Sequence, residues 1–287
     1  MRRAPWQGPT VVHAFTVDLE DWYHGIPIDG GRRATAERRL QVGTERLLEL
    51  LDRHHAKATF FCLSPTAREH PQIVRRLVEA GHDLGSHGES HDLVYEMTPE
   101  RFREETRRSI RELEDCCGRR VRSYRAAYFS ITRRSLWALE VLAETGITFD
   151  SSIFPVRNWR YGIPGYSRRP LKVDTPHGPL LEFPLPTRRV LGRNLPATGG
   201  AYFRIYPYFL TRANVRALER EGIPLVFYIH PWELDPDHPR VAFHWKARTT
   251  HYVNLRSTQG RLERLLTEFR FTTLAEVLPD ALPAAGQ

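Results

Sequence analysis

Gly85-Ser86-His87-Gly88-Glu89-Ser90-His91 places two histidines four residues apart, at the end of a short predicted strand over 83–86. In a helical turn, residues at i and i+4 share a face, so the imidazoles of His87 and His91 can both reach one ion. Neutral imidazole is a frequent ligand of Zn²⁺ and similar metals. An isolated pair of this kind is more often two surface histidines in a polar loop, so the rest of the chain has to decide between the two interpretations.

Around this stretch, predicted strands and helices alternate along the chain. The predicted strands are 11–17, 58–63, 83–86, 121–124, 147–149 and 224–229. The predicted helices are 35–54, 64–80 with Ser64 as N-cap, 98–117 with Thr98 as N-cap, 132–144 with Thr132 as N-cap, and 211–222. Such alternation is typical of parallel βαβ units, so we expect an α/β fold, specifically an irregular (β/α) barrel.

One domain accounts for most of the chain. We expect a loosely ordered N-terminal arm over residues 1–10 and a single domain over 11–287. A segment at about 155–205, rich in Pro, Gly and aromatic residues, interrupts the alternation and reads as a substrate-facing insertion with a strand at 180–184. A C-terminal tail at about 235–287 carries a further helix over 261–269.

Composition narrows the class of protein and its location. The 287 residues are 41% hydrophobic, which suits one barrel-sized domain. The net charge of +8, carried mostly by arginine, suits an acidic glycan or an anionic membrane surface, although a solvated arginine-rich surface gives the same balance. The arginines form no basic run interleaved with aromatics, so nucleic-acid binding is not expected.

Cysteine usage and hydropathy point to the cytoplasm. Three cysteines, two of them adjacent, form no disulfide framework. No apolar signal segment follows Met1, and no apolar run reaches the length of a membrane span. We therefore expect a cytoplasmic protein, with peripheral contact at the inner membrane surface left open.

Five ionisable residues stand at the ends of predicted strands: Asp18, His87, Arg125, Asp150 and His230. In a parallel barrel these strand ends share one face, where the active site is built. Any one of the five could be a capped or paired structural residue, but together they predict a site.

The first strand ends in a cluster of carboxylates, Asp18-Leu19-Glu20-Asp21. Residues at i and i+2 of a strand point the same way, so Asp18 and Glu20 can face one site. Three carboxylates repel one another unless a cation lies among them, although a cluster capping the next helix is the structural alternative. With His87 and His91, one carboxylate completes a set of two histidines and a carboxylate that is typical of a catalytic metal.

Five motifs resemble those of a known family. They are FTVDLEDW at 15–22, SHGESH at 86–91, YRAAYFS at 124–130, FDSS at 149–152 and YIHPWE at 228–233. Together they resemble the NodB-type polysaccharide deacetylases (carbohydrate esterase family 4), and more narrowly the subgroup found with exosortase and exopolysaccharide loci. The resemblance runs from Phe15 to about Leu278 and includes the tail of that subgroup. Ala127 departs from the family, which usually has Arg-x-Pro in the third motif.

The resemblance implies roles for the first half of the site. Asp18 is expected to be the general base for the attacking water, and Arg125 to keep Asp18 in place and ionised. Glu20 is expected to be the third metal ligand beside His87 and His91, with Asp21 as the alternative.

The second half of the site is expected to carry the general acid. His230 would protonate the leaving amine, and Asp150 would pair with it and raise its pKa. The backbone N–H near Tyr128 would help to bind the oxyanion. Trp232 and Tyr202 are candidate stacking surfaces for a sugar, although each would also serve in ordinary packing.

The resulting hypothesis is a metal-dependent hydrolase of carbon–nitrogen bonds other than peptide bonds. It would remove N-acetyl groups from an amino sugar of a polysaccharide or of its lipid-linked precursor, in exopolysaccharide biosynthesis. One divalent ion is expected, Zn²⁺ first, with Co²⁺, Ni²⁺ or Fe²⁺ also suited to the ligand set. The alternatives are another hydrolase on the same fold that cleaves a cyclic amide or imide, and a glycan-binding protein without catalysis.

Overall fold

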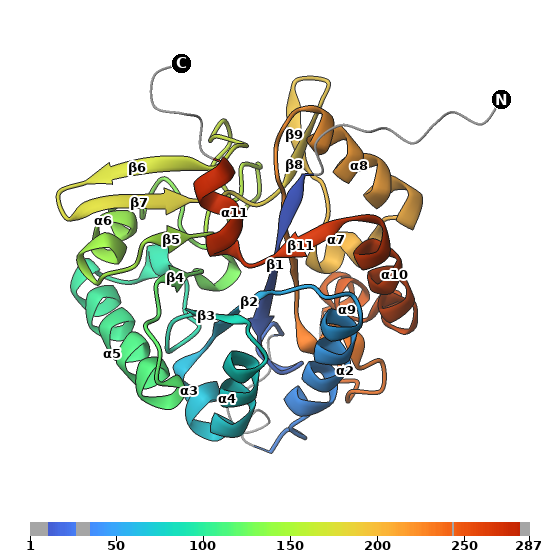
Figure 1. Ribbon diagram of the computed structural model, residues 1–287, viewed down its shortest axis with the longest axis horizontal. Coiled ribbons are helices and arrows are strands. Elements are labelled where there is room, and N and C mark those ends of the chain that lie inside the picture. Colours follow the sequence, from blue (N-terminus) through green and yellow to red (C-terminus); the bar gives the residue numbers. More distant parts are fainter. Residues whose placement is uncertain (1–10, 27–34, 243, 282–287) are drawn as a thin grey trace.

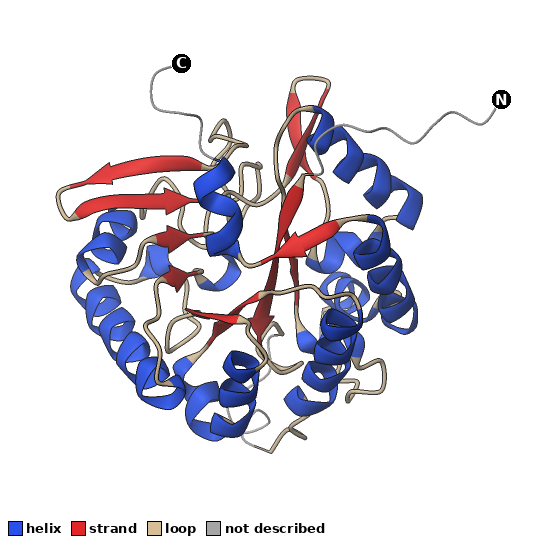
Figure 2. Cartoon of the chain, viewed as in Figure 1, coloured by secondary structure: helices blue, strands red, loops and turns tan. Residues whose placement is uncertain are grey.

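Strand β1 (Val12–Leu19) is the centre of the sheet, because three other strands pair with it in parallel. The structure is a computed structural model that describes residues 11–26, 35–242 and 244–281. The predicted arm over 1–10 lies outside these residues. Figure 2 shows the strands in the middle of the molecule and most helices around them.

The remaining strands are β2 (Thr59–Cys62), β3 (Asp83–Ser86), β4 (Ser123–Tyr124), β5 (Phe149–Asp150), β6 (Leu171–Thr175), β7 (Gly178–Glu182), β8 (Thr187–Val190), β9 (Arg193–Pro196), β10 (Val226–Ile229) and β11 (Arg270–Thr272). The main sheet has the order β10-β1-β2-β3-β4-β5-β7-β6, and β11 also pairs with β1. All neighbours from β10 to β7 are parallel, and β6 is an antiparallel edge. The sheet curls into a half-barrel (Figure 1), and within the described ranges no pairing joins β6 to β10 to close it. The predicted irregular α/β barrel is confirmed.

The helices are α2 (Leu40–Arg53), α3 (Ser64–Glu69), α4 (Pro71–Glu79), α5 (Pro99–Cys117), α6 (Trp137–Glu144), α7 (Gly200–Ile205), α8 (Tyr208–Arg220), α9 (Trp245–Tyr252), α10 (Leu255–Glu268) and α11 (Leu274–Ala281). Short 3₁₀ helices are η1 (Val94–Glu96), η2 (Ala127–Phe129) and η3 (Pro231–Leu234). No helix of the described ranges is both long and apolar enough to cross a membrane.

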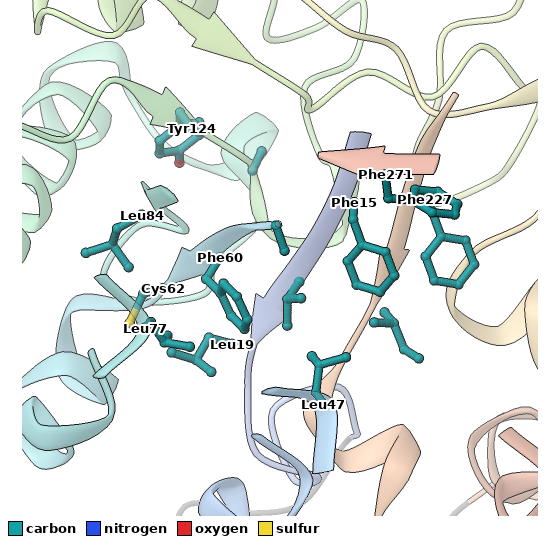
Figure 3. Packing of buried hydrophobic residues seen from close by; sticks show 14 of the residues in the cluster. Phe15, Leu19, Leu47, Phe60, Cys62, Leu77, Leu84, Tyr124, Phe227 and Phe271 are labelled. Atoms are coloured by element: carbon teal, nitrogen blue, oxygen red, sulfur yellow. The ribbon is translucent and has the colours of Figure 1, made fainter. Parts of the chain in front are cut away.

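The core forms where β1 meets its neighbours. Phe15 on β1 packs against Phe227 on β10 and Phe271 on β11, with ring centroids 5.2 Å and 5.6 Å apart (Figure 3). All three are buried, since a central parallel strand is covered on both faces. This packing fixes the height of β1 relative to β10, and so the position of the polar residues at their ends.

Several predicted helix boundaries differ from the structure. The single helix over 64–80 is split into α3 and α4, because Pro71 has no N–H and its ring disfavours helical geometry at His70, which has φ −132°. Ser64 is the first helical residue and Leu63 takes the cap position, so that prediction was wrong. α6 begins at Trp137 rather than beside Thr132, whose N–H donates to Ser135 Oγ in a turn. By contrast, the Thr98 cap of α5 is confirmed, as its hydroxyl accepts from the N–H of Arg101.

The segment at 155–205 is more regular than the sequence indicated. It contains β6 and β7, which extend the main sheet, the separate β8–β9 hairpin, and α7. The tail is also part of the fold, because β11 pairs with β1 and α10 begins at Leu255, six residues before the predicted helix. α7 and α9 were not predicted.

Candidate active site

Polar side chains from the ends of β1, β3, β4 and β10 meet at one face of the sheet. Asp18, His87, Arg125 and His230, four of the five predicted strand-end residues, belong to this group. They converge because the carboxyl ends of parallel strands lie together. Asp150 also ends its strand but contacts other groups, as described below.

Glu20, His87 and His91 form the centre of the site. Glu20 Oε1 lies 2.8 Å from His87 Nε2 and 2.7 Å from His91 Nε2. One ligand atom from each residue falls within a radius that a single metal ion could span, all within 4.8 Å of one another. Burial opposes the ionised form of Glu20, but the two imidazoles hold its pKa well below the usual range.

A bent loop, not a helical turn, brings the two histidines together. Residues 87–91 contain no helix, and left-handed φ values at Gly88 (+86°) and His91 (+59°) turn the chain back on itself. A positive φ is unfavourable for a residue such as His91, and strain of this kind is concentrated at functional sites. The i, i+4 spacing therefore predicted the right pair of histidines, but a bent loop brings them together and not the helical turn that the spacing implied.

The hydrogen bonding of His87 fits a cation at this site. His87 Nδ1 lies 2.8 Å from the carbonyl oxygen of Arg125, an acceptor, so Nδ1 carries a proton. In the neutral ring, Nε2 then presents a lone pair to the Glu20 carboxylate, which is repulsive unless a cation lies between them or the ring is protonated. A metal ligand held through its second ring nitrogen in this way is common in metalloproteins. The three residues therefore fit a divalent metal.

Asp21 is turned away from this centre. Its Oδ1 accepts from the N–H of Trp22 at 2.8 Å, and its Oδ2 accepts from the N–H groups of Arg39 and Leu40 at 2.8 Å and 3.1 Å. It therefore caps the start of α2, as the structural alternative proposed for the whole cluster. Of the two candidate ligands, Glu20 faces the histidines and Asp21 does not.

Asp18 is held by a buried arginine. Arg125 Nη1 donates to Asp18 Oδ1 and to Thr16 Oγ1, at 2.8 Å each, and its Nε and Nη2 donate to the carbonyl oxygen and the hydroxyl of Ser151. The Phe61 ring lies 4.3 Å from the guanidinium carbon. The arginine is 0% exposed, and its contact with Asp18 agrees with the predicted pairing.

His230 lies beside Asp18 and is paired with Glu233. His230 Nε2 is 3.8 Å from Asp18 Oδ2, and its Nδ1 is 2.8 Å from Glu233 Oε1. Burial lowers the pKa of His230, but the Glu233 carboxylate, with Glu20 and Asp18, outweighs it and raises the pKa to about 9. Burial likewise opposes charge on Glu233, yet Arg204 and His230 lower its pKa to about 2.

The predicted pairing of Asp150 with His230 is wrong. Asp150 accepts from Ser152 Oγ at 2.6 Å and meets Glu182 at the end of β7. Burial raises the pKa of both carboxyl groups, that of Glu182 well above its usual range, so the pair shares a proton. Ser152 Oγ also accepts from the N–H of Ala126, so Asp150 supports the loop that carries Arg125.

Tyr128 borders the metal-ligand centre. Its backbone is left-handed (φ +54°), its ring centroid lies 4.6 Å from that of His91, and its hydroxyl donates to the carbonyl of His24 at 3.1 Å. The guanidinium carbon of Arg160 lies over the Tyr128 ring, 3.7 Å from its centroid. Ala127, at the position where the family usually has proline, is buried in this turn.

The two aromatic candidates for sugar stacking are placed differently from expectation. Trp232 is only 7% exposed and is stacked between His230, 5.4 Å away, and His251, 4.2 Å away, so it is a packing residue and not an open platform. Tyr202 is half-buried, and its hydroxyl lies 3.1 Å from that of Tyr161.

Three residues of the site had no predicted role there: Glu233, Arg204 and Glu182. Glu233 stands three residues after His230 in the fifth motif, which is the one local signal that could have identified it. Arg204 and Glu182 reach the site only through the tertiary fold.

A cavity of about 470 Å³, lined in part by Tyr23, His24, Glu89 and His91, adjoins the centre and is of ligand-binding size.

Two segments of the chain match known families. Residues 29–149 match the polysaccharide deacetylase family, and residues 151–279 match a domain of unknown function, DUF3473. Residues 29–149 of this chain are therefore a polysaccharide deacetylase domain. The carboxylates of β1 lie before the matched residues, so their place in the site rests on the geometry above. The narrower resemblance to the exosortase-associated subgroup stays a prediction.

The curated relatives are similar to this chain over only part of its length. A peptidoglycan-N-acetylglucosamine deacetylase of Bacillus cereus is 32% identical over 98 residues, which are 34% of this chain and 36% of that protein. A peptidoglycan deacetylase of Helicobacter pylori is 27% identical over 113 residues, 39% of this chain and 38% of that protein. The chain therefore spans about two fifths of the length of these curated relatives.

Solved structures share the whole fold. A Mycobacterium smegmatis structure that bears the polysaccharide deacetylase name has a TM-score of 0.68 at 20% identity, over 97% of this chain and 92% of that one. The allantoinase Puue has a TM-score of 0.58 at 17% identity, over 96% and 91%. At these identities the likeness concerns the fold alone.

Proposed function

We propose that this protein is a metal-dependent N-deacetylase of an N-acetylated amino sugar, within a polysaccharide or its lipid-linked precursor. One observation carries the proposal: the Glu20–His87–His91 set lies beside a carboxylate paired with arginine, Asp18, and a histidine paired with a carboxylate, His230. Hydrolysis of an amide needs a base for the attacking water and an acid for the leaving nitrogen, and this arrangement supplies both.

Each residue has a definite task in this proposal. Asp18, held in place by Arg125, accepts the proton of the attacking water. His230, whose pKa is raised to about 9, is protonated at neutral pH and donates to the leaving nitrogen. The two side chains come from neighbouring strands, so the amide would lie between them. Arg125 stays a cation throughout and only fixes Asp18.

The metal belongs to the same proposal. Glu20, His87 and His91 would hold one divalent ion, with zinc as the first candidate because two imidazoles and a carboxylate with open positions suit it. When bound, such an ion acts as a Lewis acid on water and on the acyl carbonyl.

The substrate class is supported by the relatives, whose names specify peptidoglycan and its N-acetylglucosamine. The polar cavity beside His91, with side chains of both charges, suits a sugar better than an apolar ligand. For the compartment, we propose the cytoplasm, supported by three free cysteines, which a reducing environment preserves. Peripheral membrane contact stays part of the proposal for a lipid-linked substrate.

A second candidate function is hydrolysis of a cyclic amide, because an allantoinase has the same fold. The two reactions share the need for a base and a metal, so substrate profiling separates them. A glycan-binding protein without catalysis is the third candidate and predicts binding without release of acetate.

The test measures acetate release by the zinc-loaded protein from N-acetylated glucosamine oligomers and peptidoglycan fragments, and in parallel the ring opening of allantoin as the cyclic amide. Asp18→Asn and His230→Ala should each abolish most of the release. Asp174→Asn and His177→Ala, on the exposed β6–β7 hairpin, are matched controls that should keep it. Full activity in either site variant would remove the role given to that residue.

A further inference from the structure

Arg204 is a buried arginine that the reaction described above does not use. It is 2% exposed and lies on α7, within Gly199-Gly200-Ala201-Tyr202-Phe203-Arg204. Burying a guanidinium is costly unless it is fully paired, so its partners indicate why it is there.

One side of Arg204 faces the pair of Glu233 and His230. Arg204 Nε donates to Glu233 Oε2 at 2.5 Å. The other oxygen of Glu233, Oε1, accepts from the backbone N–H of His230 at 3.0 Å and lies 2.8 Å from its ring Nδ1. Both oxygens of the carboxylate are therefore used, and Glu233 cannot rotate without breaking a contact at each end.

The other side of Arg204 faces the C-terminal tail. Its Nη1 donates to the carbonyl oxygens of Thr250, His251 and Val253, at 3.0 Å, 2.8 Å and 3.0 Å. These carbonyls stand at the C-terminal end of α9, where unpaired carbonyls and the helix dipole favour a cation. The guanidinium thus joins the end of α9 to the Glu233 carboxylate.

Further contacts fix the backbone of Arg204. Asn254 Nδ2 and Arg261 Nη1, both from the tail, donate to the Arg204 carbonyl at 2.8 Å each. On the other flank, Gly199 and Gly200 have positive φ values, and a Cβ on either would lie 2.4 Å or 2.5 Å from the Tyr228 ring. Only glycine allows α7 to approach β10 this closely. The Gly199-Gly200 pair and the tail therefore both help to place Arg204 beside Glu233.

We propose that the 151–279 segment, a domain of unknown function, forms the acid half of the active site, in which Arg204 and the tail position Glu233 and Glu233 positions His230. This inference rests on the proposed function for the role of His230 as general acid. Arg204, Glu233, Asn254 and Arg261 are positioning residues, because none of them faces the metal-ligand centre. The C-terminal tail then helps to position the residues of the active site.

The charges around His230 support the assignment to Glu233. Asp18 and Glu20 face it from β1, Tyr228 lies on its own strand, and His251 lies behind Trp232 on α9. Burial lowers the pKa of His251 to about 3, so His251 is neutral and adds no charge. Glu233 is the carboxylate in hydrogen-bond contact with the His230 ring, and it is the group whose removal should be felt most.

The decisive experiment follows the His230 ring by NMR in metal-free, ¹⁵N-histidine-labelled protein, with the signal assigned by His230→Asn. Glu233→Gln should lower the pKa of His230 from about 9 to about 6.5 or below, because burial then acts without its opposing carboxylate. Glu268→Gln, which removes an exposed partner of Arg212, is the matched control and should leave that pKa unchanged.

A second pair of variants tests Arg204 itself. Arg204→Lys keeps the charge but cannot hold Glu233 and three carbonyls together, so amide exchange at 250–254 should rise at least about tenfold and the His230 pKa should fall in part. Arg212→Lys is the matched control on the neighbouring α8. If Glu233→Gln does not fold because Arg204 is left unpaired, the double variant Arg204→Met with Glu233→Gln removes both charges and gives the same NMR readout.

The activity profile links the inference to the reaction. With the zinc-loaded enzyme, Glu233→Gln should move the alkaline limb of the kcat–pH profile to lower pH by about 2.5 units, which is about a 30-fold loss of kcat at pH 8. A folded Glu233→Gln variant whose His230 pKa is unchanged would overturn the inference. If the His230 pKa shifts as expected while the wild type releases no acetate from any glycan, the positioning stands and the proposed function fails.

Discussion

The proposed base half and the proposed acid half of this site both rely on a buried arginine, but they use it differently. Arg125 contacts Asp18 directly, whereas Arg204 contacts Glu233, which in turn contacts His230. A cation beside a carboxylate favours its ionised form, but a cation beside an imidazole would lower its pKa and remove the proton that an acid must donate. Glu233, which lies between Arg204 and His230, raises the pKa of the imidazole where a neighbouring arginine would lower it. An arginine can therefore support a base in one half and an acid in the other.

The largest expected effect concerns the centre between the two halves. His87→Ala and Glu20→Gln should each reduce bound zinc from about one ion per chain to almost none, and activity should fall at least about 100-fold, since each removes a ligand. Elemental analysis of the purified protein and an acetate-release assay check this. His177→Ala, an exposed histidine, should keep the metal. Zinc retained by both ligand variants would place the metal elsewhere.

The next effect separates the two halves. Asp18→Asn should cost about 10²–10⁴ in kcat at all pH values, because Asn cannot accept the proton. His230→Ala should cost a similar factor at neutral pH but less above about pH 9, where the wild-type histidine has itself lost its proton. The measurement is kcat against pH for wild type and both variants. Identical profiles for the two variants would argue against distinct acid and base roles.

The acid half should also show in the pH dependence of stability. His230 has a folded pKa of about 9, above its unfolded value of about 6.5, so its contribution is fully present below pH 6.5 and is lost as pH rises to 9. Glu233 has a folded pKa of about 2, below its unfolded value of about 4.3, so its contribution is present above pH 4.3 and is lost as pH falls to 2.

Denaturant unfolding from pH 3 to pH 10 measures this window. The wild type should be most stable between about pH 4.5 and 6.5, and Glu233→Gln should flatten the dependence on both sides. Other groups also titrate in this range, so the quantity to compare is the difference between the two proteins. A constant difference at every pH would contradict the pairing.

The smallest effect is expected at the pair of Asp150 and Glu182. The raised pKa of Glu182 means that it is protonated in the folded protein, so Glu182→Gln should change the free energy of unfolding by less than about 1.5 kcal/mol. Glu182→Ala should cost about 2–4 kcal/mol, because it leaves a cavity and unpairs Asp150. Chemical denaturation at pH 7 distinguishes them, and equal losses for Gln and Ala would mean that Glu182 is ionised.

Local patterns in the sequence accounted for much of the base half. Short apolar runs predicted β1 and β10, and the Thr98 cap marked the start of α5, because these features depend on neighbours a few residues apart. The strand ends then predicted that Asp18, His87, Arg125 and His230 converge, since parallel strands impose a common face. These predictions needed no knowledge of which residues pair across the sheet.

Only the tertiary structure decided which carboxylate serves which partner. Glu20 and Asp21 are adjacent, and their roles as metal-site residue and helix cap depend on the direction of each side chain at the end of β1. The partner of His230 is Glu233 and not Asp150, and the partner of Glu233 is an arginine 29 positions earlier that the tail holds in place. Side-chain direction and contacts between distant segments arise from packing, which no local pattern records. The sequence by itself thus determined the strand ends and the residue types that meet there, and the folded chain determined the pairs on which the proposed acid, base and metal site depend.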